Sequence, residues 1–331
     1  MGNFFSKHAL LFLTLSSPSG DGSGAPADEL SQEQVEAILS ISSLPRIPTP
    51  QELAYRETHY QWSDKILGQG EFSVVHKAIL REDGRAVAIK RVAPNALTPQ
   101  RVQQMYAEAR TLSQIAEFKG AHHFVRLLEG FLDHQGGICL VMDRAGDADL
   151  FELIEENPHG MPEREAKLFL KQIFSAIEEL HSHDLAHLDI KLENIMYDRK
   201  TNKIKLIDFG FTRPTQQIDP LSGRSMPRMQ TQFCGSLDYS APEILRHTPY
   251  DGKRADVWSL GVLTFVLLTG DYPFEGKKRV HTMQNIVRGK YEMPPHLSPE
   301  AQSLLRRMIQ RYPDNRCHVG SLLRHPWFQA K

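Results

Sequence analysis

The sequence predicts an α+β protein of two lobes, the first rich in strands and the second mainly helical. Its 331 residues allow two lobes at about 150 residues per domain. Strand-like segments come early, for example Val74–Leu80 and Val87–Lys90. Later, the apolar run Val257–Leu268 contains Trp258 and Gly261 and predicts a buried core helix.

The composition excludes several classes of function. With 39 Lys and Arg against 40 Asp and Glu, the formal net charge is −1, so no general attraction to nucleic acid is expected. The three widely spaced cysteines exclude a disulfide scaffold and indicate a reducing compartment; they are Cys139, Cys234 and Cys317. No run approaches the roughly 18 apolar residues of a membrane-spanning helix. We therefore expect a cytoplasmic protein without a nucleic-acid partner.

The first residues match an acylation pattern. Met1–Ser6 reads M-G-N-F-F-S, which fits the N-myristoylation rule at Gly2. One myristoyl chain binds membranes with an association constant of only about 10⁴ M⁻¹, so the membrane association would be weak. The apolar run Ala9–Leu15 is also compatible with the core of a signal peptide, although it is short and no clear cleavage site follows.

Residues 1–59 form an extension before the folded lobes. Ser16–Ala27 has the composition of a flexible linker, and residues 28–40 carry a weak amphipathic helical pattern. This helix either packs on the main domain or serves as a docking or regulatory element. The domain itself begins near Tyr60.

A glycine-rich segment opens the domain. Gly68–Ser73 reads G-Q-G-E-F-S between two strand-like stretches. Glycines let backbone N–H groups approach phosphate oxygens because no Cβ intervenes. Ser73 replaces the third glycine of the usual phosphate loop, and taken alone the segment is better explained as a plain hairpin turn.

A strand lysine follows about one hairpin later. Val87–Lys90 reads V-A-I-K, and a lysine that faces a glycine loop can hold the α- and β-phosphates of a nucleotide. Such a lysine needs a carboxylate to position it. The predicted helix Pro99–Ile115 offers Glu108, for which a surface role is the alternative.

Further along, the segments H-L-D-I-K-L-E-N and I-K-L-I-D-F-G bring chemically useful side chains close together in sequence. These are Asp189, Lys191, Asn194 and Asp208. Phosphoryl transfer requires a carboxylate that accepts the hydroxyl proton, a cation near the γ-phosphate and oxygen ligands for Mg²⁺. The set predicts this chemistry.

Together these motifs resemble the eukaryotic protein kinase family over about residues 60–328. Ala241–Glu243 reads A-P-E, as at the end of an activation segment, and His325–Phe328 reads H-P-W-F, as in the closing helix. The resemblance implies that Arg316 pairs with Glu243. Within the family, the catalytic-loop sequence and the terminal H-P-W-F are most similar to the calmodulin-dependent kinase group.

The resemblance implies the bilobal kinase fold. A β-rich N-lobe would cover residues 60–142 and a mainly helical C-lobe residues 143–328, with ATP in the cleft between them. Asp256–Gly261 would belong to a buried organising helix.

The resemblance also implies catalytic roles. Asp189 would be the base, Lys191 would stabilise the transferred phosphoryl group, and Ser236 would bridge the two. Asn194 and Asp208 would hold Mg²⁺.

Nucleotide binding is implied for a longer set of residues. Lys90 and Glu108 would form the ion pair of the active state, and Met142 would be the gatekeeper. The set of ATP-binding residues is Leu67, Gly68, Gln69, Gly70, Glu71, Phe72, Ser73, Val75, Ala88, Lys90, Met142, Asp143, Ala145, Asp149 and Glu193.

Two departures from the family pattern concern regulation. Leu188 replaces the arginine that usually precedes the catalytic aspartate and clamps a phosphate of the activation loop. Gln232 stands where related kinases carry the phosphorylated threonine, although Thr231 is adjacent. We therefore expect activity that does not require loop phosphorylation.

The segment Ile218–Met229 is rich in Pro, Gly, Ser and Arg and predicts a flexible surface loop. The alternative is a regulatory loop phosphorylated at Ser222, Ser225 or Thr231.

The sequence predicts the substrate preference only in part. Asp149 and Glu193 stand where kinases that prefer basic substrates place carboxylates, which favours a basic residue two or three places upstream of the target. The alternative is that Asp149 contacts only the ribose. We expect no C-terminal calmodulin-binding tail, and we expect a monomer.

The sequence thus predicts a Mg·ATP-dependent kinase acting on Ser and Thr of protein substrates. A pseudokinase scaffold, which uses the fold for binding alone, is the main alternative. A kinase of small molecules is the other, and the A-P-E segment counts against it.

Overall fold

The computed structural model describes residues 58–70, 72–219, 222–233 and 235–329. The acylation pattern at Gly2, the predicted helix over 28–40 and Glu71 lie outside these residues. The chain divides into two compact units. The first comprises the described residues up to Ala116 together with Arg126–Arg144, and the second comprises Glu117–Val125 and the residues from Ala145 onwards.

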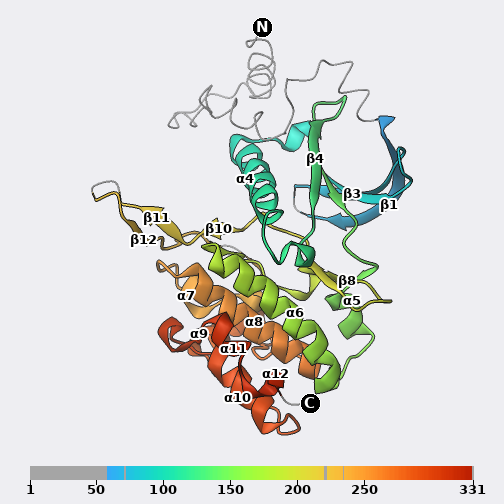
Figure 1. The fold of residues 1–331 in the computed structure, drawn as a ribbon. Helices are drawn as coiled ribbons and strands as arrows, with labels where there is room; N and C mark the ends of the chain where they lie inside the picture. The colour runs from blue at the N-terminus through green and yellow to red at the C-terminus, as the bar shows by residue number, and fades with distance from the viewer. Residues whose placement is uncertain (1–57, 71, 220–221, 234, 330–331) are drawn as a thin grey trace. The chain divides into compact units, whose positions relative to one another are not determined.

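The first unit is built on an antiparallel sheet of five strands in the order β1-β2-β3-β5-β4 (Figure 1). The strands are β1 (Tyr60–Gln69), β2 (Val74–Leu80), β3 (Ala86–Val92), β4 (Leu127–Leu132) and β5 (Ile138–Asp143). Residues along β3 alternate between the faces, so Val87 and Ile89 are fully buried while Ala88 and Lys90 point to the other side.

One long helix, α4 (Pro99–Ile115), joins this sheet and packs against β4. The Thr98 side chain accepts a hydrogen bond from Arg101 N at 3.3 Å, and Pro99 occupies the first turn, where its missing N–H costs nothing. The predicted bounds of this helix are therefore confirmed. A short 3₁₀ turn, η1 (Pro94–Ala96), precedes it.

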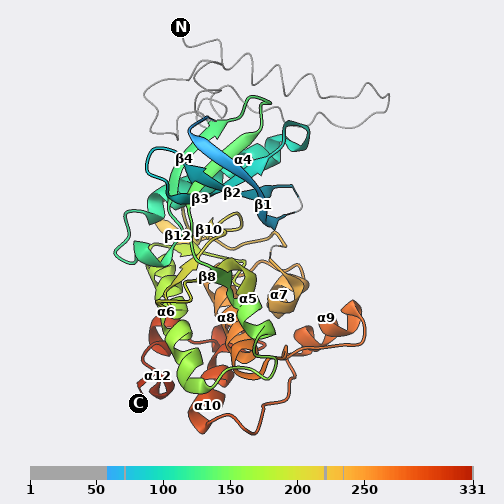
Figure 2. The same ribbon diagram turned by 90° about the vertical axis from the view of Figure 1, so that its right-hand side faces the viewer.

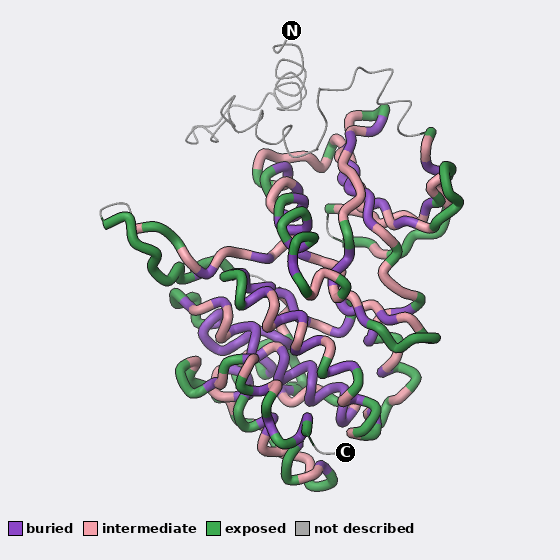
Figure 3. Tube along the Cα trace, in the orientation of Figure 1, coloured by how far each residue is buried: buried purple, intermediate pink, exposed green. Residues whose placement is uncertain are grey.

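The second unit is mainly helical. Its two long helices, α6 (Glu163–Ser182) and α8 (Gly252–Thr269), pack against each other (Figure 1 and Figure 2). Figure 3 shows α8 buried along nearly its whole length, as its sequence predicts. At Gly261 a Cβ would lie 2.7 Å from Ile309 Cγ1, so the glycine allows the close contact. The other helices are α5 (Leu150–Glu155), α7 (Pro242–Leu245), α9 (Arg279–Arg288), α10 (Pro299–Met308), α11 (Val319–Leu322) and α12 (Pro326–Gln329).

Short strands and 3₁₀ turns position the loops of the second unit. The strands form the sheet β6-β8-β9 and the pairs β7-β10 and β11-β12. Their bounds are β6 (Ala148–Asp149), β7 (Leu185–Ala186), β8 (Ile195–Tyr197), β9 (Ile204–Leu206), β10 (Arg213–Pro214), β11 (Gln216–Ile218) and β12 (Ser225–Pro227). The turns are η2 (Ala121–His123), η3 (Leu192–Asn194), η4 (Leu237–Tyr239) and η5 (Pro313–Asn315).

The pair β11-β12 differs from the flexible loop predicted for residues 218–229. Ile218 pairs with Ser225 in antiparallel register, and Asp219 N donates to Arg224 O at 2.8 Å. Gly223 closes the turn with a φ of +65°, a value that suits glycine. The hairpin is exposed (Figure 3), and Ile218 keeps 66% of its surface in solvent. Strand pairing therefore orders the described residues of a segment whose composition predicts a loop.

Among the described residues, no helix combines the length and the apolar character needed to cross a membrane.

Candidate active site

In the first unit, Lys90 and Glu108 form a closed ion pair. Lys90 Nζ donates to both carboxylate oxygens of Glu108 at 2.8 Å. Glu108 is only 3% exposed and lies on the buried face of α4. Because a buried carboxylate is costly without a partner, the pair ties the helix to strand β3.

The predicted adenine contacts share one face of the sheet. Val75 lies opposite Lys90 in the β2-β3 register, and Ala88 lies opposite Met142 in the β3-β5 register. Directly opposed residues of antiparallel strands point to the same side. Strand pairing therefore brings these four side chains to the face opposite Val87 and Ile89. Asp143, which ends β5, accepts a hydrogen bond from Arg126 N at 2.6 Å.

The glycine segment forms a turn between β1 and β2. Leu67, Gly68 and Gln69 end β1, and Gly70 N donates to Ser73 O at 2.8 Å. A Cβ at Gly68 would meet no described atom within 4 Å, so the backbone there is open to a ligand.

Phe72, at the tip of this turn, packs against a cation. Its ring lies 3.5 Å from the guanidinium carbon of Arg101 at the start of α4.

In the second unit, a buried carboxylate fixes the loop that carries Asp189. Asp256 is fully buried in α8. Its Oδ2 accepts from His187 N at 2.8 Å and lies 2.9 Å from His181 Nε2, while its Oδ1 accepts from Leu188 N at 2.8 Å. Leu188 adopts a φ of +66°, which is unfavourable for a residue with a Cβ. The two backbone hydrogen bonds hold this strained conformation.

His187 supports the same loop from within the core. It is 1% exposed, and its Nδ1 accepts from Asp189 N at 3.3 Å. Burial lowers the pKa of His187 below its ordinary value, against the pull of the nearby Asp256, Asp189 and Asp208 carboxylates. The ring therefore stays neutral and serves as an acceptor.

Asp189, Lys191, Asn194 and Ser236 meet at the end of this loop. Lys191 Nζ lies 2.9 Å from Asp189 Oδ2 and donates to Ser236 Oγ at 3.1 Å, so the lysine links the other two. Asn194 Nδ2 donates to the same Asp189 Oδ2 at 2.8 Å. Among the residues that the structure describes, no donor reaches Asp189 Oδ1. This oxygen is the one that can accept a further proton donor.

Asn194 and Asp208 offer the oxygen ligands expected of a Mg²⁺ site. The amide nitrogen of Asn194 is engaged with Asp189, which leaves its Oδ1 to face a different partner. The pairing of β8 with β9 and the bond from Ile207 N to Asn194 O at 3.1 Å bring Asp208 to the same end of the sheet. Gly210 N donates to Asp208 Oδ1 at 3.0 Å and orients the carboxylate. Hard oxygen donors of this kind fit Mg²⁺.

The A-P-E segment is anchored by a buried ion pair. Arg316 Nη1 donates to Glu243 Oε1 at 2.6 Å, and Nη2 donates to Oε2 at 2.8 Å. Arg316 also donates to the backbone oxygens of Gln310 and Arg254, and its guanidinium carbon lies 5.1 Å from the ring centre of Trp258.

The segment before it is held by backbone contacts. Gln230 N donates to Tyr250 O at 2.8 Å, and Tyr250 N donates back to Gln230 O at 2.9 Å. Tyr250 also donates its hydroxyl to Gln232 O at 3.0 Å. Gln230 is 8% exposed.

The remaining predicted residues lie at the start of the second unit and in η3. Ala145 follows the end of the first unit. Asp149 caps α5, because its Oδ1 accepts from Glu152 N at 2.9 Å. Partial removal from water, together with the carboxylates of Asp189 and Asp149, raises the pKa of Glu193.

Sequence reasoning assigned no contacts to Asp256, His181, Gln230 or Tyr250. The signal for Asp256 was present, because an aspartate within a run that predicts a buried helix must find hydrogen-bond donors. Gln230 and Tyr250 pair with each other through their backbone, and that pairing leaves no trace in the residue types.

Comparison with known proteins identifies the class. Residues 62–328 match the family model for the protein kinase domain. The chain is 35% identical over 267 residues to the SNF-related serine/threonine-protein kinase of Homo sapiens, an alignment that covers 81% of this chain and 33% of that protein. It is 32% identical over 295 residues to the serine/threonine-protein kinase SIK2 of Gallus gallus, with 88% and 35% covered.

The chain therefore belongs to the protein kinase family, and its β-rich and helical units are the two lobes of the kinase fold. It spans about a third of the length of these curated relatives, both of which are named as serine/threonine kinases. Kinases of this family generally use Mg·ATP. The predicted fold class and family are confirmed.

Proposed function

We propose that the protein transfers the γ-phosphate of Mg·ATP to Ser and Thr hydroxyls of protein substrates. The observation that carries this is the cluster of Asp189, Lys191 and Asn194, in which the described residues provide no donor to Asp189 Oδ1 or to the Asn194 amide oxygen. The free carboxylate oxygen suits the proton of a substrate hydroxyl, and the amide oxygen suits a metal ion.

Each of these residues has a separate role in the in-line transfer of the phosphoryl group. Asp189 takes the hydroxyl proton as the substrate oxygen attacks the γ-phosphorus and ADP departs, while Lys191 offsets the negative charge of the transferred group. Asn194 and Asp208 hold Mg²⁺, which neutralises the phosphate oxygens when bound. Lys90, oriented by Glu108, holds the α- and β-phosphates, beside the glycine turn.

Replacing Asp189 by Asn tests the proposal. The variant keeps the hydrogen-bonding shape but cannot take a proton, so kcat should fall about 10²- to 10⁴-fold with ATP binding retained. Asp184→Asn is the matched control, because Asp184 is an exposed aspartate with a φ of +57°, which Asn tolerates well. Wild-type protein that binds ATP but transfers no phosphate to any Ser/Thr peptide would instead support the scaffold.

We also propose that activity does not need a phosphate on the activation segment. Two features support this. Leu188 places an apolar side chain, 6% exposed, at the position where related kinases have an arginine that binds the phosphate. This side chain is closely packed, because a Cβ at Gly252 would lie only 3.3 Å from Leu188 Cδ2. The backbone bridge between Gln230 and Tyr250 holds the segment without any charge. Phosphatase-treated protein from bacteria should keep its full kcat/KM, and a tenfold or larger loss would contradict the proposal.

A preference for a basic residue upstream of the target is our third proposal. Burial, with smaller contributions from the carboxylates of Asp189 and Asp149, raises the pKa of Glu193, and a cation on the substrate would favour its charged form. Peptides with Arg two or three places before the Ser should be better substrates than those with Ala, and Glu193→Gln should reduce the ratio. If the ratio is unchanged, Asp149 and Glu193 contact only the nucleotide and do not bind the substrate peptide.

From the sequence alone we infer weak membrane association through a myristoylated Gly2. Gly2→Ala should then shift the full chain from the membrane to the soluble fraction, and equal partition of both forms would remove the idea.

A further inference from the structure

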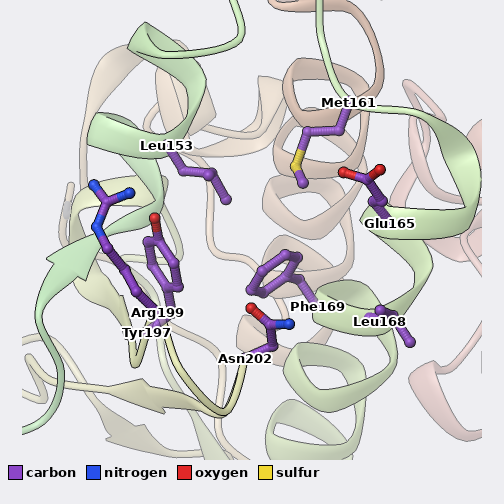
Figure 4. A pocket seen from close by; sticks show the side chains of 8 residues that line it. All are labelled: Leu153, Met161, Glu165, Leu168, Phe169, Tyr197, Arg199 and Asn202. Carbon is purple, nitrogen blue, oxygen red and sulfur yellow. The ribbon is translucent and has the colours of Figure 1, made fainter.

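The second unit contains a cavity that the proposed reaction does not use. It has a volume of about 290 Å³ and lies among α5, the start of α6 and the turn from β8 to β9 (Figure 4). Side chains of Leu153, Met161, Phe169 and Tyr197 converge on it. Met161 and Phe169 are 7% and 5% exposed, so the floor of the cavity is apolar.

One buried polar atom of this lining, the Tyr197 hydroxyl oxygen, lacks a hydrogen bond to the described residues. Tyr197 is 3% exposed, and its hydroxyl has no hydrogen-bond partner among the residues that the structure describes. Its ring is fixed edge-on to Phe169, with the ring centres 5.6 Å apart. The neighbouring Arg199 does not serve it, because its guanidinium is committed to Glu156 at 2.6 and 3.0 Å. A buried hydroxyl without a partner is unfavourable, so an acceptor brought by a ligand would be strongly favoured there.

The rim adds groups that match a peptide. Leu168 projects from α6 with 56% of its surface exposed. Glu165, one turn earlier, carries a side chain with no hydrogen bond or ion pair among the described residues, and the side chain of Asn202 stands across from it (Figure 4). An amide both donates and accepts, and a free carboxylate attracts a cation.

We propose that this cavity is a docking site for a linear segment of a protein substrate, away from the phosphorylated residue. One aliphatic side chain of the segment fills the cavity between Leu153, Met161 and Phe169. A neighbouring peptide carbonyl accepts from the Tyr197 hydroxyl, and a Lys or Arg of the segment faces Glu165. The proposal rests on the proposed function, since the segment belongs to a protein that the kinase phosphorylates.

The size and the chemistry of the cavity both favour this occupant. Small-molecule sites have volumes of roughly 300–1,000 Å³, so this one lies at the lower limit and suits a single large side chain better than a cofactor. The polar side chains of the lining are the Tyr197 hydroxyl, the Asn202 amide, the Glu165 carboxylate and the Arg199 guanidinium, and Glu156 already engages the last of these. The other three form a set that a peptide bond and a basic side chain satisfy together.

The test uses the full chain without ATP and short synthetic peptides that contain no Ser, Thr or Tyr. Such peptides cannot be phosphorylated, so binding reports on docking alone. The library varies one aliphatic and one basic position, and binding is followed by fluorescence anisotropy and by the NMR signal of the Met161 methyl group. A separate assay of phosphate transfer to an untethered substrate peptide shows whether the proposed function itself holds.

Peptides with both an aliphatic and a basic residue should bind and shift the Met161 signal. Leu168→Asp should weaken their Kd about tenfold or more. Val280→Asp is the matched control, because Val280 is another exposed aliphatic residue on a helix, at 51% exposure, and binding should not change. Tyr197→Phe should weaken binding about fivefold without loss of thermal stability, since it removes only an unpartnered hydroxyl.

Three results would overturn the proposal. These are the absence of binding by any peptide, binding that is the same in the Leu168→Asp and Tyr197→Phe variants, and a response of Met161 to indole alone. The last would make the cavity a small-molecule site. Failure of docking with intact phosphate transfer would refute this inference and leave the proposed function in place.

Discussion

Loss of the Glu243 carboxylate should destabilise the second unit far more than loss of an exposed carboxylate with similar geometry. The side chains of Arg316 and Glu243 are 0% and 7% exposed, and two parallel hydrogen bonds of 2.6 and 2.8 Å join them. Glu243→Gln removes the negative charge and leaves the guanidinium buried beside a neutral amide. Breaking one side of a buried pair costs about 3–5 kcal/mol.

The control pair is Glu156 with Arg199. It is also bidentate, at 2.6 and 3.0 Å, but its side chains are 52% and 44% exposed. Solvent screens such a pair and the long side chains lose entropy in forming it, so Glu156→Gln should leave the free energy of unfolding unchanged. The two ion pairs have similar geometry and differ in burial, so burial is the reason for the different losses of stability that we expect.

Urea denaturation followed by tryptophan fluorescence measures the difference, because Trp258 lies beside Arg316 in the core. With a slope of about 3 kcal/mol per molar urea, a loss of 3 kcal/mol lowers the midpoint of the second unit by about 1 M. Since two units need not unfold together, the transition must be assigned to the second unit before it is compared. Equal midpoints for wild type and Glu243→Gln would refute the reasoning, as would a large shift in Glu156→Gln.

Three further predictions follow from the described contacts. Lys90→Met leaves the buried Glu108 without its cation, so kcat should fall about 10²-fold or more, and steady-state kinetics that match wild type would contradict this. Gly235→Ala places a Cβ 2.7 Å from Leu188 O at a φ of +84°, which should displace the Asp189 loop and reduce kcat/KM about 10²-fold in a peptide assay. Burial tends to raise the pKa of Glu163, but hydrogen bonds from Ser298 and Trp327 outweigh it and hold the pKa below 4.5. The stabilisation is therefore present above about pH 4.5 and lost as the pH falls through the folded-state pKa, and urea midpoints in Glu163→Gln should lack this acid-sensitive part.

Local signals predicted the regular elements well. The helix α4 spans Pro99–Ile115 and β2 spans Val74–Leu80, both as predicted. In both cases the information lies within a few residues of the element. Caps and strand patterns act over that distance, so a single sequence contains them.

Contacts that depend on distant backbone could not be predicted in the same way. The hairpin β11-β12 replaces a predicted flexible loop because Asp219 and Gly223 form a turn, and its strands are too short and too exposed to carry a pattern. The cavity beneath Leu168 was not predicted at all, since its lining comes from three elements separated along the chain. The pairing of Arg316 with Glu243 came from family resemblance and not from spacing.

The position of Asp256 has a consequence for the dynamics of the loop that carries Asp189. The backbone amides of His187 and Leu188 donate to a carboxylate that belongs to α8, a long helix whose residues are nearly all buried. Their hydrogens can exchange with solvent only when these bonds open, and opening them requires α8 to move or the loop to abandon its strained conformation. We therefore expect these two amides to exchange as slowly as those of the helix core, so that a segment without regular secondary structure behaves, on the timescale of hours, as part of the core.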